Sequence, residues 1–397
     1  MPGFELFGEA ERKEVQDVLN SGVLMRYGFD NQRQGHWKAK AMELEICQQL
    51  NVKHAQLLSS GTAAVTSALV VAGIGAGDEV IVPAFTFVAS FEAVLMVGAT
   101  PVLVDIDDTL TMSPAAVAQA ISAKTKAVMP VHMCGSMADM DALKSICKTE
   151  NLLLIEDACQ AIGGTYKGQN LGTIGDLGCF SFDAVKTITC GEGGAVITNN
   201  DLFAPLLDQY SDHGHDHLGS NRGTDGHPIL GYNFRISELN AAVGLAQVRR
   251  LPEFLRHQKH YYHILKTALA RIPEIEFRRV PEGGEESYAF LNFFLPTEEQ
   301  TKAAMLLFAD QGIGDCFHYL DNNWHYVRQW DHLKWGNALN NLNEAQKIGL
   351  ARIGRQNFQR SDAFLGRNIS CLIKLGMTPT EVEQRAELMA TLIGKVV

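Results

Sequence analysis

The sequence lacks the features that mark nucleic-acid-binding, membrane-spanning or secreted proteins. It has no excess of positive charge: the formal net charge is −11 at pH 7 and the pI is about 5.6. This acidic balance argues against nucleic acid or an anionic membrane as a main partner. The first residues contain neither the basic stretch nor the apolar core of a signal peptide, and serine, threonine and glycine interrupt the long uncharged segment 57–77. We therefore expect a cytoplasmic protein that binds neither a membrane nor nucleic acid.

The sequence also lacks paired metal ligands. Its eight cysteines are scattered without a CxxC pair, and several lie in apolar segments, where cysteine acts as a small hydrophobic residue. The histidine-rich stretch 213–217 alternates its histidines, and no cysteine or carboxylate set completes a site. We expect a reduced protein without a metal, in which residues 213–227 form a polar, substrate-facing loop. No GxSxG, HExxH or Walker sequence is present.

Short apolar runs alternate with helical patterns through the first half of the chain. The pattern predicts strands in segments 54–60, 78–85, 100–106, 125–133, 152–158, 178–182 and 194–199. Strands that alternate with helices predict an α/β fold with a doubly wound, mostly parallel sheet. A long helical stretch covers about residues 237–270, and alternating strands and a last helix over about 380–392 follow. We expect a large domain over 1–250, including the N-terminal segment, and a small α+β domain over 251–397.

The sequence SFDAVKTITCGEGG, residues 181–194, places Lys186 in an otherwise apolar stretch with a glycine-rich exit. Upstream of it, Asp157 follows the apolar run 152–155 and Glu156. A buried lysine and a buried carboxylate are what pyridoxal 5′-phosphate (PLP) requires. The lysine forms a Schiff base with the cofactor, and the carboxylate keeps the pyridine nitrogen protonated. We predict that Lys186 and Asp157 are catalytic, although a surface lysine and a helix-capping aspartate are the ordinary alternatives for each alone.

Further candidates for the cofactor site follow other predicted strands. Ser60, Gly61 and Thr62 open a helix, and backbone N–H groups at a helix N-terminus bind phosphate. Ser181 offers a hydroxyl to the same phosphate. The remaining candidates are Gln160, which faces the ring edge, and Phe87 or Phe85, which stacks on the ring or packs in the core. All of these residues lie at the carboxyl ends of predicted strands, where open α/β sheets bind ligands.

The motifs SSGTAA, EDACQAIGG, GDLGCFSF, the lysine segment and GYNFRISELNAAVGLAQ together resemble the DegT/StrS family of sugar aminotransferases. The resemblance implies the type I PLP-dependent aminotransferase fold and a homodimer with composite active sites. It also implies that Gly61, Thr62 and Ser181 hold the phosphate and that Phe87 stacks on the cofactor. Asn233 of GYNFR would reach the cofactor phosphate of the other subunit. The amino donor would be glutamate and the acceptor a keto-sugar.

Three segments depart from the usual family pattern: residues 25–40, 212–228 and 318–326. With the two chain ends, they resemble the subgroup that transfers an amino group to C8 of 8-oxo-3,8-dideoxy-D-manno-octulosonate (8-oxo-Kdo). The product of that subgroup, 8-amino-3,8-dideoxy-D-manno-octulosonate, enters lipopolysaccharide. A keto-sugar acid needs cationic and polar partners, and the candidates in or near these segments are Arg26, Lys38, Arg222 and Arg235 for carboxylates and His215 and His318 for hydroxyls.

Two alternatives remain open from the sequence. A nucleotide-linked keto-sugar is the other acceptor of the same reaction class. A non-catalytic regulator that binds PLP or a sugar is the alternative of another class, and the retained Lys186 and Asp157 argue against it.

Overall fold

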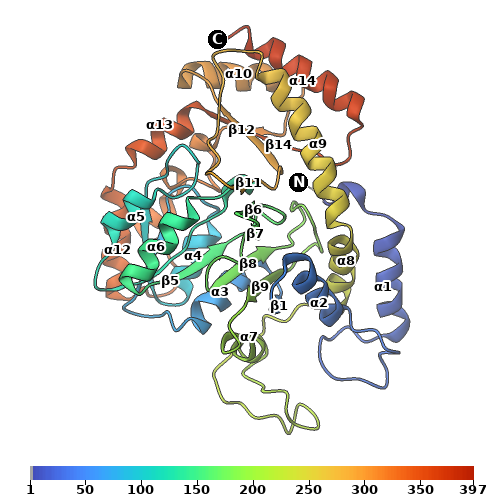
Figure 1. The fold of residues 1–397 in the computed structure, drawn as a ribbon. Coiled ribbons are helices and arrows are strands. Elements are labelled where there is room, and N and C mark those ends of the chain that lie inside the picture. The colour runs from blue at the N-terminus through green and yellow to red at the C-terminus, as the bar shows by residue number, and fades with distance from the viewer. Residues whose placement is uncertain (1–2) are drawn as a thin grey trace.

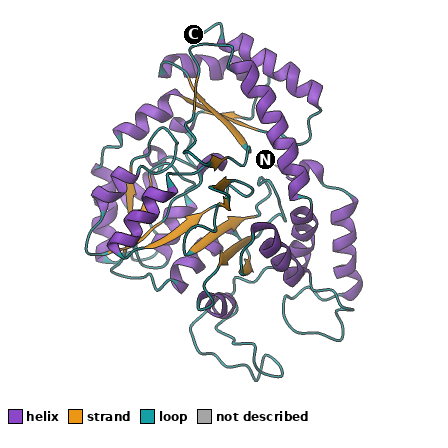
Figure 2. Cartoon of the chain, in the orientation of Figure 1, coloured by secondary structure: helices purple, strands orange, loops and turns teal. Residues whose placement is uncertain are grey.

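The computed structural model describes residues 3–397, and a seven-stranded sheet forms its centre (Figures 1 and 2). The strand order is β1-β9-β8-β5-β4-β2-β3. In that order the strands are β1 (His54–Leu58), β9 (Gly194–Thr198), β8 (Leu177–Ser181), β5 (Leu153–Asp157), β4 (Thr125–Val128), β2 (Glu79–Pro83) and β3 (Thr100–Val104). Neighbours from β8 to β3 pair in parallel, whereas β9 pairs antiparallel with both β8 and β1. The predicted doubly wound, mostly parallel sheet is confirmed, with β9 as the reversed strand.

Neighbouring residues of a strand point to opposite faces of a sheet. In this sheet, the residues on both faces are buried. Leu58, Ile155 and Val196 pack into the cluster that contains α3 (Gly61–Val71) and α4 (Ala89–Met96). Leu57 and Ile197 pack with α2 (Lys38–Leu50) and α8 (Glu238–Arg249), and Leu154 packs with α5 (Pro114–Ala120) and α6 (Met140–Glu150). The continuous apolar runs of the sequence are therefore explained by a sheet that helices cover on both sides.

A second, antiparallel sheet has the order β10-β12-β14-β13 and lies apart from the first at the top of Figure 1. Its strands are β10 (Glu276–Phe277), β12 (Phe290–Phe294), β14 (Asn368–Leu372) and β13 (Cys316–Phe317). Three helices pack on it, namely α9 (Leu251–Leu269), α10 (Glu298–Asp310) and α14 (Pro379–Ile393). This arrangement is the expected small α+β unit. The long helical stretch predicted over 237–270 is two successive helices, α8 and α9.

The C-terminal half also returns to the large sheet. The segment 319–358 contains α11 (Asp331–Trp335) and α12 (Glu344–Arg355), and it is followed by α13 (Gln359–Arg367). Tyr326, Trp330 and Phe358 are buried in the same cluster as α3 and α4. Segment 319–358 belongs to the predicted small domain, but these contacts pack it against the large sheet. The domain boundary at 250/251 stays a prediction.

The remaining elements connect or flank these layers. They are α1 (Glu9–Ser21), α7 (Phe203–Ser211), the short strands β6 (Thr165–Tyr166), β7 (Gln169–Asn170) and β11 (Gly284–Glu285), and the 3₁₀ turns Gly3–Leu6, Met133–Gly135, Tyr319–Asp321 and Val327–Gln329. The loop after α7 contains residues 213–227 and extends well beyond the body of the molecule (Figure 1). No helix in the stretch 3–397 is both long and apolar enough to cross a membrane.

One expectation about the cysteines is wrong in this structure. Cys316 and Cys371 form a disulfide, although we predicted a fully reduced chain. The two residues are 55 positions apart in sequence, but they face each other across the antiparallel pair β13 and β14 with Cα atoms 4.1 Å apart. This pairing depends on strand register, which the scattered spacing of the cysteines did not reveal.

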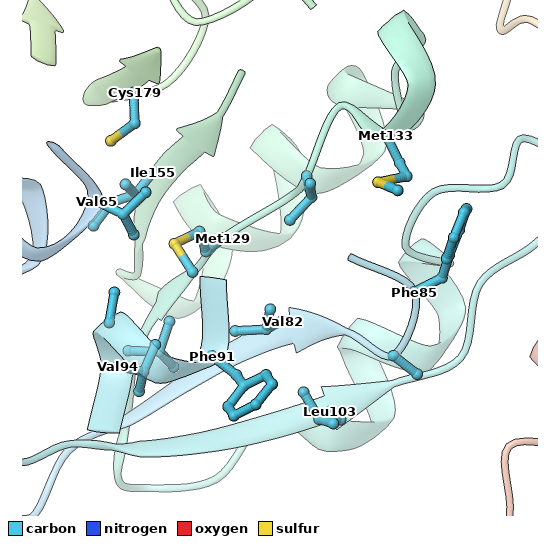
Figure 3. Packing of buried hydrophobic residues seen from close by; sticks show 14 of the residues in the cluster. Val65, Val82, Phe85, Phe91, Val94, Leu103, Met129, Met133, Ile155 and Cys179 are labelled. Atoms are coloured by element: carbon cyan, nitrogen blue, oxygen red, sulfur yellow. The ribbon is translucent and has the colours of Figure 1, made fainter. Parts of the chain in front are cut away.

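The α4 face of the core provides a test of the packing (Figure 3). Phe91 on α4 is 1% exposed, and its ring centroid lies 4.6 Å from that of Trp330. We expect Phe91→Ala to lower the free energy of unfolding by about 3–5 kcal/mol, because it leaves a cavity in a closed core. Leu306→Ala on α10, where the side chain is 68% exposed, is the control and should change it by less than about 0.5 kcal/mol. Chemical denaturation measures both, and equal effects would contradict this packing of α4.

Candidate active site

A cavity of about 280 Å³ opens where β5 and β8 end. It is lined by all the predicted cofactor residues except Asn233, namely Ser60, Gly61, Thr62, Phe87, Asp157, Gln160, Ser181 and Lys186. Ser90, Val131, Cys159, Asp183, Glu192, Trp324 and His325 complete most of the wall. The structure thus brings together residues that lie more than 120 positions apart, at the sheet edge where the sequence predicted them.

Asp157 is the last residue of β5 and is 5% exposed. Its Oδ2 accepts a hydrogen bond from the Ser90 hydroxyl at 2.7 Å, and its Oδ1 accepts one from the backbone N–H of Cys159 at 3.2 Å. Ser90 is itself 2.6 Å from the Thr86 hydroxyl. These contacts fix the orientation of the carboxylate at the wall of the cavity.

Lys186 lies in the loop between β8 and β9. Its backbone N–H donates to Asp183 O at 3.0 Å, and its carbonyl accepts from the N–H of Gly3 at the same distance. The side-chain Nζ lies 6.0 Å from the centroid of the Phe87 ring, and no residue in the described part of the chain makes a hydrogen bond or ion pair with it. The loop backbone is therefore held in place while the amine remains available for chemistry.

The phosphate-binding turn is formed by a very close approach of three elements. A Cβ on Gly61 would lie 2.7 Å from Ser181 Cβ, and a Cβ on Gly194 would lie 2.2 Å from Ser60 O. Glycine is thus required at both positions for α3 to approach β8 and β9. The Ser60 hydroxyl accepts from Ala63 N at 3.0 Å and caps α3. It is therefore the unpaired N–H groups of Gly61 and Thr62, with the Ser181 hydroxyl, that can hold an anion.

Gln160 supplies a donor at the opposite side of the cavity. Its Oε1 accepts a hydrogen bond from the backbone N–H of Cys134 at 3.0 Å, which identifies the other side-chain atom as the NH₂ group. That group has no partner among residues 3–397 and suits an oxygen on a ring. The donor turn, the aromatic ring of Phe87, the carboxylate and the free amine together fit PLP.

Two residues of this cavity, Trp324 and His325, were not predicted. The Trp324 ring stacks on Phe87 with a centroid separation of 5.7 Å, and the His325 ring lies 5.4 Å from Phe87. Burial and the neighbouring charge of Lys186 lower the pKa of His325 to about 3. The sequence marked segment 318–326 as atypical and suggested His318. His325, rather than His318, lies in the cavity because of a long-range contact. Its backbone carbonyl accepts a hydrogen bond from the backbone N–H of Thr86 at 3.0 Å.

The predicted substrate residues lie outside this cavity and are occupied by partners. Arg222 and Arg235 both bind the buried carboxylate of Asp212. Arg26 pairs with Glu43 at 2.6 Å and lines, together with Arg222, a separate cavity of about 650 Å³. The other candidates are paired as follows: Lys38 with Glu14 and Asp17, His215 with Asp225, and His318 with Asp321 and the carbonyl of Gly366. Within one subunit, the structure does not bring these residues to Lys186, and their roles stay proposals.

Asn233 also lies outside the cavity. It is exposed and forms an isolated antiparallel bridge with Asp212, at the base of the loop that contains residues 213–227. Its assignment to a partner's cofactor remains a prediction.

The Asp212 cluster gives the loop a dependence on pH. His217 lies 2.7 Å from Asp208 and 2.9 Å from Asp212, and its ring stacks on Tyr27. Burial opposes protonation, but the hydrogen bond to Asp212 and the charge of Asp208 outweigh it and raise the pKa of His217 above its usual 6.5. The stabilisation is therefore complete below pH 6.5 and disappears as the pH rises through the raised pKa.

We expect His217→Gln to lower the melting temperature at pH 5.5 by a few degrees and to have a smaller effect at pH 9. Thermal unfolding followed across this range measures the difference. His227→Gln, at an exposed position of the same loop, is the control and should show no such trend. If His217→Gln lowered the melting temperature by the same amount at every pH, the charge of His217 would contribute nothing to stability.

The close approach at Gly61 can be tested through cofactor affinity. Gly61→Ala places a methyl group against Ser181 and must displace that residue. We expect the affinity of the apo-protein for PLP to fall by about tenfold, which corresponds to the loss of one charge-assisted hydrogen bond. Gly75→Ala is the matched control, because its Cβ would meet only a backbone oxygen at 3.7 Å. Fluorescence titration measures both, and equal affinities would contradict the proposed phosphate turn.

Comparisons with known proteins agree with this site. The model of the DegT/DnrJ/EryC1/StrS aminotransferase family matches residues 6–349. A GDP-perosamine synthase from Vibrio cholerae is 36% identical over 289 residues, which cover 72% of this chain and 75% of the relative. A GDP-perosamine synthase from Caulobacter vibrioides is 44% identical over 222 residues, which cover 56% of this chain. That match spans 59% of the Caulobacter protein, so the chain aligns with somewhat less than two thirds of its length.

Solved structures show the same fold over almost the whole chain. An aminotransferase from Psychrobacter cryohalolentis has a TM-score of 0.85 at 26% identity, with 98% of both chains covered. A protein from Streptococcus pneumoniae, described as a sugar aminotransferase and solved with PLP, has a TM-score of 0.82 at 27% identity. That comparison covers 98% of this chain and 97% of the other. The fold and the site therefore define a PLP-dependent aminotransferase.

This chain belongs to the DegT/DnrJ/EryC1/StrS aminotransferase family. The family assignment confirms the resemblance found in the sequence, and it removes the non-catalytic regulator from consideration. The two GDP-perosamine synthases are named for a nucleotide-linked sugar rather than for a free sugar acid.

Proposed function

We propose that this enzyme transfers an amino group from glutamate to the carbonyl carbon of a nucleotide-linked keto-sugar. The observation that carries the reaction is the free Nζ of Lys186 in one cavity with the hydrogen-bonded carboxylate of Asp157. The nucleotide is supported by the two GDP-perosamine synthases, whose names specify a GDP-linked amino sugar. This acceptor was the alternative from the sequence, where 8-oxo-Kdo was the expected one.

Bound PLP supplies an aldehyde that exchanges amines and a ring that accepts electrons. Asp157 would hold a proton on the ring nitrogen, and the donors of Gly61, Thr62 and Ser181 would hold the phosphate. Phe87 would lie against the ring. Lys186 moves a proton from the α-carbon of glutamate, and later returns a proton to the sugar carbon that receives the amine.

A free sugar acid, 8-oxo-Kdo, is the second candidate acceptor. The observation that favours it is the small volume of the cofactor cavity, about 280 Å³, which the stacked rings of Trp324 and Phe87 help to enclose. An aldehyde at the end of a carbon chain enters such a space more easily than a carbonyl within a sugar ring. The three atypical segments of the sequence point to the same acceptor.

We also propose a homodimer with composite active sites. The exposed position of Asn233 and the extended loop 213–227, which lie outside the Lys186 cavity of their own subunit, support this arrangement. In such a dimer the predicted substrate residues Arg26, His215, Arg222 and Arg235 would act at the partner's cofactor.

The role of Lys186 can be tested by substitution. We expect Lys186→Ala to reduce turnover by at least about a thousandfold, because its amine is both the proposed attachment point of PLP and the group that moves the proton. The variant should still bind PLP through the phosphate contacts. Lys53→Ala is the control, since that side chain is 58% exposed and pairs only with Asp201. Turnover with glutamate within tenfold of wild type would contradict the assignment.

The acceptor is identified by a direct comparison. The enzyme is first converted with glutamate, and a GDP-linked 4-keto-sugar or 8-oxo-Kdo is then added. We expect the GDP-linked sugar to restore the visible cofactor absorbance at least about tenfold faster. Faster recovery with 8-oxo-Kdo would establish the second candidate, and recovery with neither would contradict sugar amination.

A further inference from the structure

A buried arginine from the second half of the chain holds a turn of the first half. Arg278 follows β10, and its side chain is 2% exposed. Its guanidinium donates to the carbonyl oxygens of Met133 and Cys134 at 2.9 and 3.0 Å, and it forms an ion pair with Glu286. Both carbonyls belong to the 3₁₀ turn Met133–Gly135, which follows β4. Arg278 therefore connects the two halves of the chain at this turn.

The backbone of this turn lies in the left-handed region and needs such support. Cys134 has φ 53° and ψ 34°, a conformation that costs energy for a residue with a Cβ. The next residue, Gly135, has φ 76° and lies so close to Ser287 that a Cβ on it would be 2.2 Å from the serine hydroxyl oxygen. A guanidinium offers its donors in a rigid planar fork, so Arg278 can fix two successive carbonyls of the turn at once.

The fixed turn determines how the Gln160 amide points. The backbone N–H of Cys134 donates to Gln160 Oε1 at 3.0 Å, and the NH₂ group has no partner among residues 3–397. Gln160 lines the cofactor cavity together with Asp157 and Lys186. An amide carries a donor at one end and an acceptor at the other, so without the Cys134 contact it could present either end to the cavity.

Arg278 itself is not available to a substrate. It is not among the described residues that line the cofactor cavity, and its charge is balanced by the buried carboxylate of Glu286. The other oxygen of that carboxylate accepts from the Tyr262 hydroxyl of α9 at 2.7 Å. Any influence of Arg278 on the reaction must therefore pass through the turn that it holds.

We propose that Arg278 is a positioning residue for the cofactor. It holds the turn whose N–H orients the Gln160 amide, so that the NH₂ group donates to the ring oxygen of PLP. This inference rests on the proposed PLP chemistry, and it does not depend on which sugar is the acceptor. A donor at that oxygen stabilises its anionic form. The oxygen then holds the proton of the neighbouring imine less tightly, so the imine between PLP and Lys186 loses that proton at a lower pH.

The pKa of this imine, read from the visible absorbance of the PLP-loaded enzyme as the pH is varied, tests the role. Gln160→Leu should raise it by about one pH unit, as for one lost hydrogen bond to an anion. Arg278→Met should raise it by about half as much, because the amide is then free to turn. Arg278→Lys keeps a charge beside Glu286 but lacks the planar fork, and it should also raise the pKa. Arg279→Met is the control, since that side chain is 47% exposed and pairs with Asp108, and it should leave the pKa unchanged.

A double variant separates positioning from a direct effect of the buried charge. In a Gln160→Leu background, Arg278→Met should cause no further rise, because two changes that act through the same amide do not add. If Arg278→Met does not fold, Arg278→Lys carries the same comparison. An equal rise in both backgrounds, no rise in Arg278→Lys, or a visible band that does not titrate in the wild type would overturn the role of Arg278. The absence of any visible band in the PLP-loaded wild type would instead contradict the attachment of PLP to Lys186, and this inference with it.

Discussion

The close approach of α3 to β8 and β9 is the constraint on which the rest of the site depends. Gly61 and Gly194 allow backbone contacts that any side chain would prevent, so the N-terminus of α3 reaches the carboxyl end of β8. The two N–H groups of the helix and the Ser181 hydroxyl then share one corner of the cavity. The loop that leaves β8 brings Lys186 into the same cavity as the carboxylate of Asp157, which is the arrangement that we propose for PLP.

Long-range contacts close the site on its other side. The segment 322–326 pairs with residues 86–88, and it places Trp324 and His325 over Phe87. The same C-terminal region packs on the large sheet through the cluster around α3 and α4. The residues of this cavity proposed to hold PLP thus come from the first half of the chain, whereas Trp324 and His325 in the cavity wall come from the second half. Such a division allows acceptor specificity to change while the catalytic residues remain fixed.

The residues proposed for the cofactor, except Asn233, lie in one cavity, and they could be proposed because each follows a strand or opens a helix, which is a local pattern. Lys186 and Asp157 were proposed in this way, and a doubly wound, mostly parallel sheet was predicted, but neither its strand order nor the reversal of β9 was. His325 was missed, and His318 was chosen in the same segment, because only the contact between Thr86 and His325, which lie 239 positions apart (325 − 86), distinguishes them. The Cys316–Cys371 bond, between residues 55 positions apart, was also missed because it depends on strand pairing. The ion pair of Arg222 with Asp212 was missed although the two residues are only 10 positions apart. The acceptor sugar depends on segments outside the shared motifs and was the least predictable feature.

The central claim is that the cofactor is attached to Lys186 in the cavity at the ends of β5 and β8. Borohydride reduction of the PLP-loaded enzyme, followed by peptide mass mapping, tests it directly, because reduction makes an imine between PLP and a lysine permanent. The account predicts the added cofactor mass on the peptide that contains Lys186 and on no other peptide. A label on another lysine, such as Lys38 or Lys40, or no label at all, would contradict it.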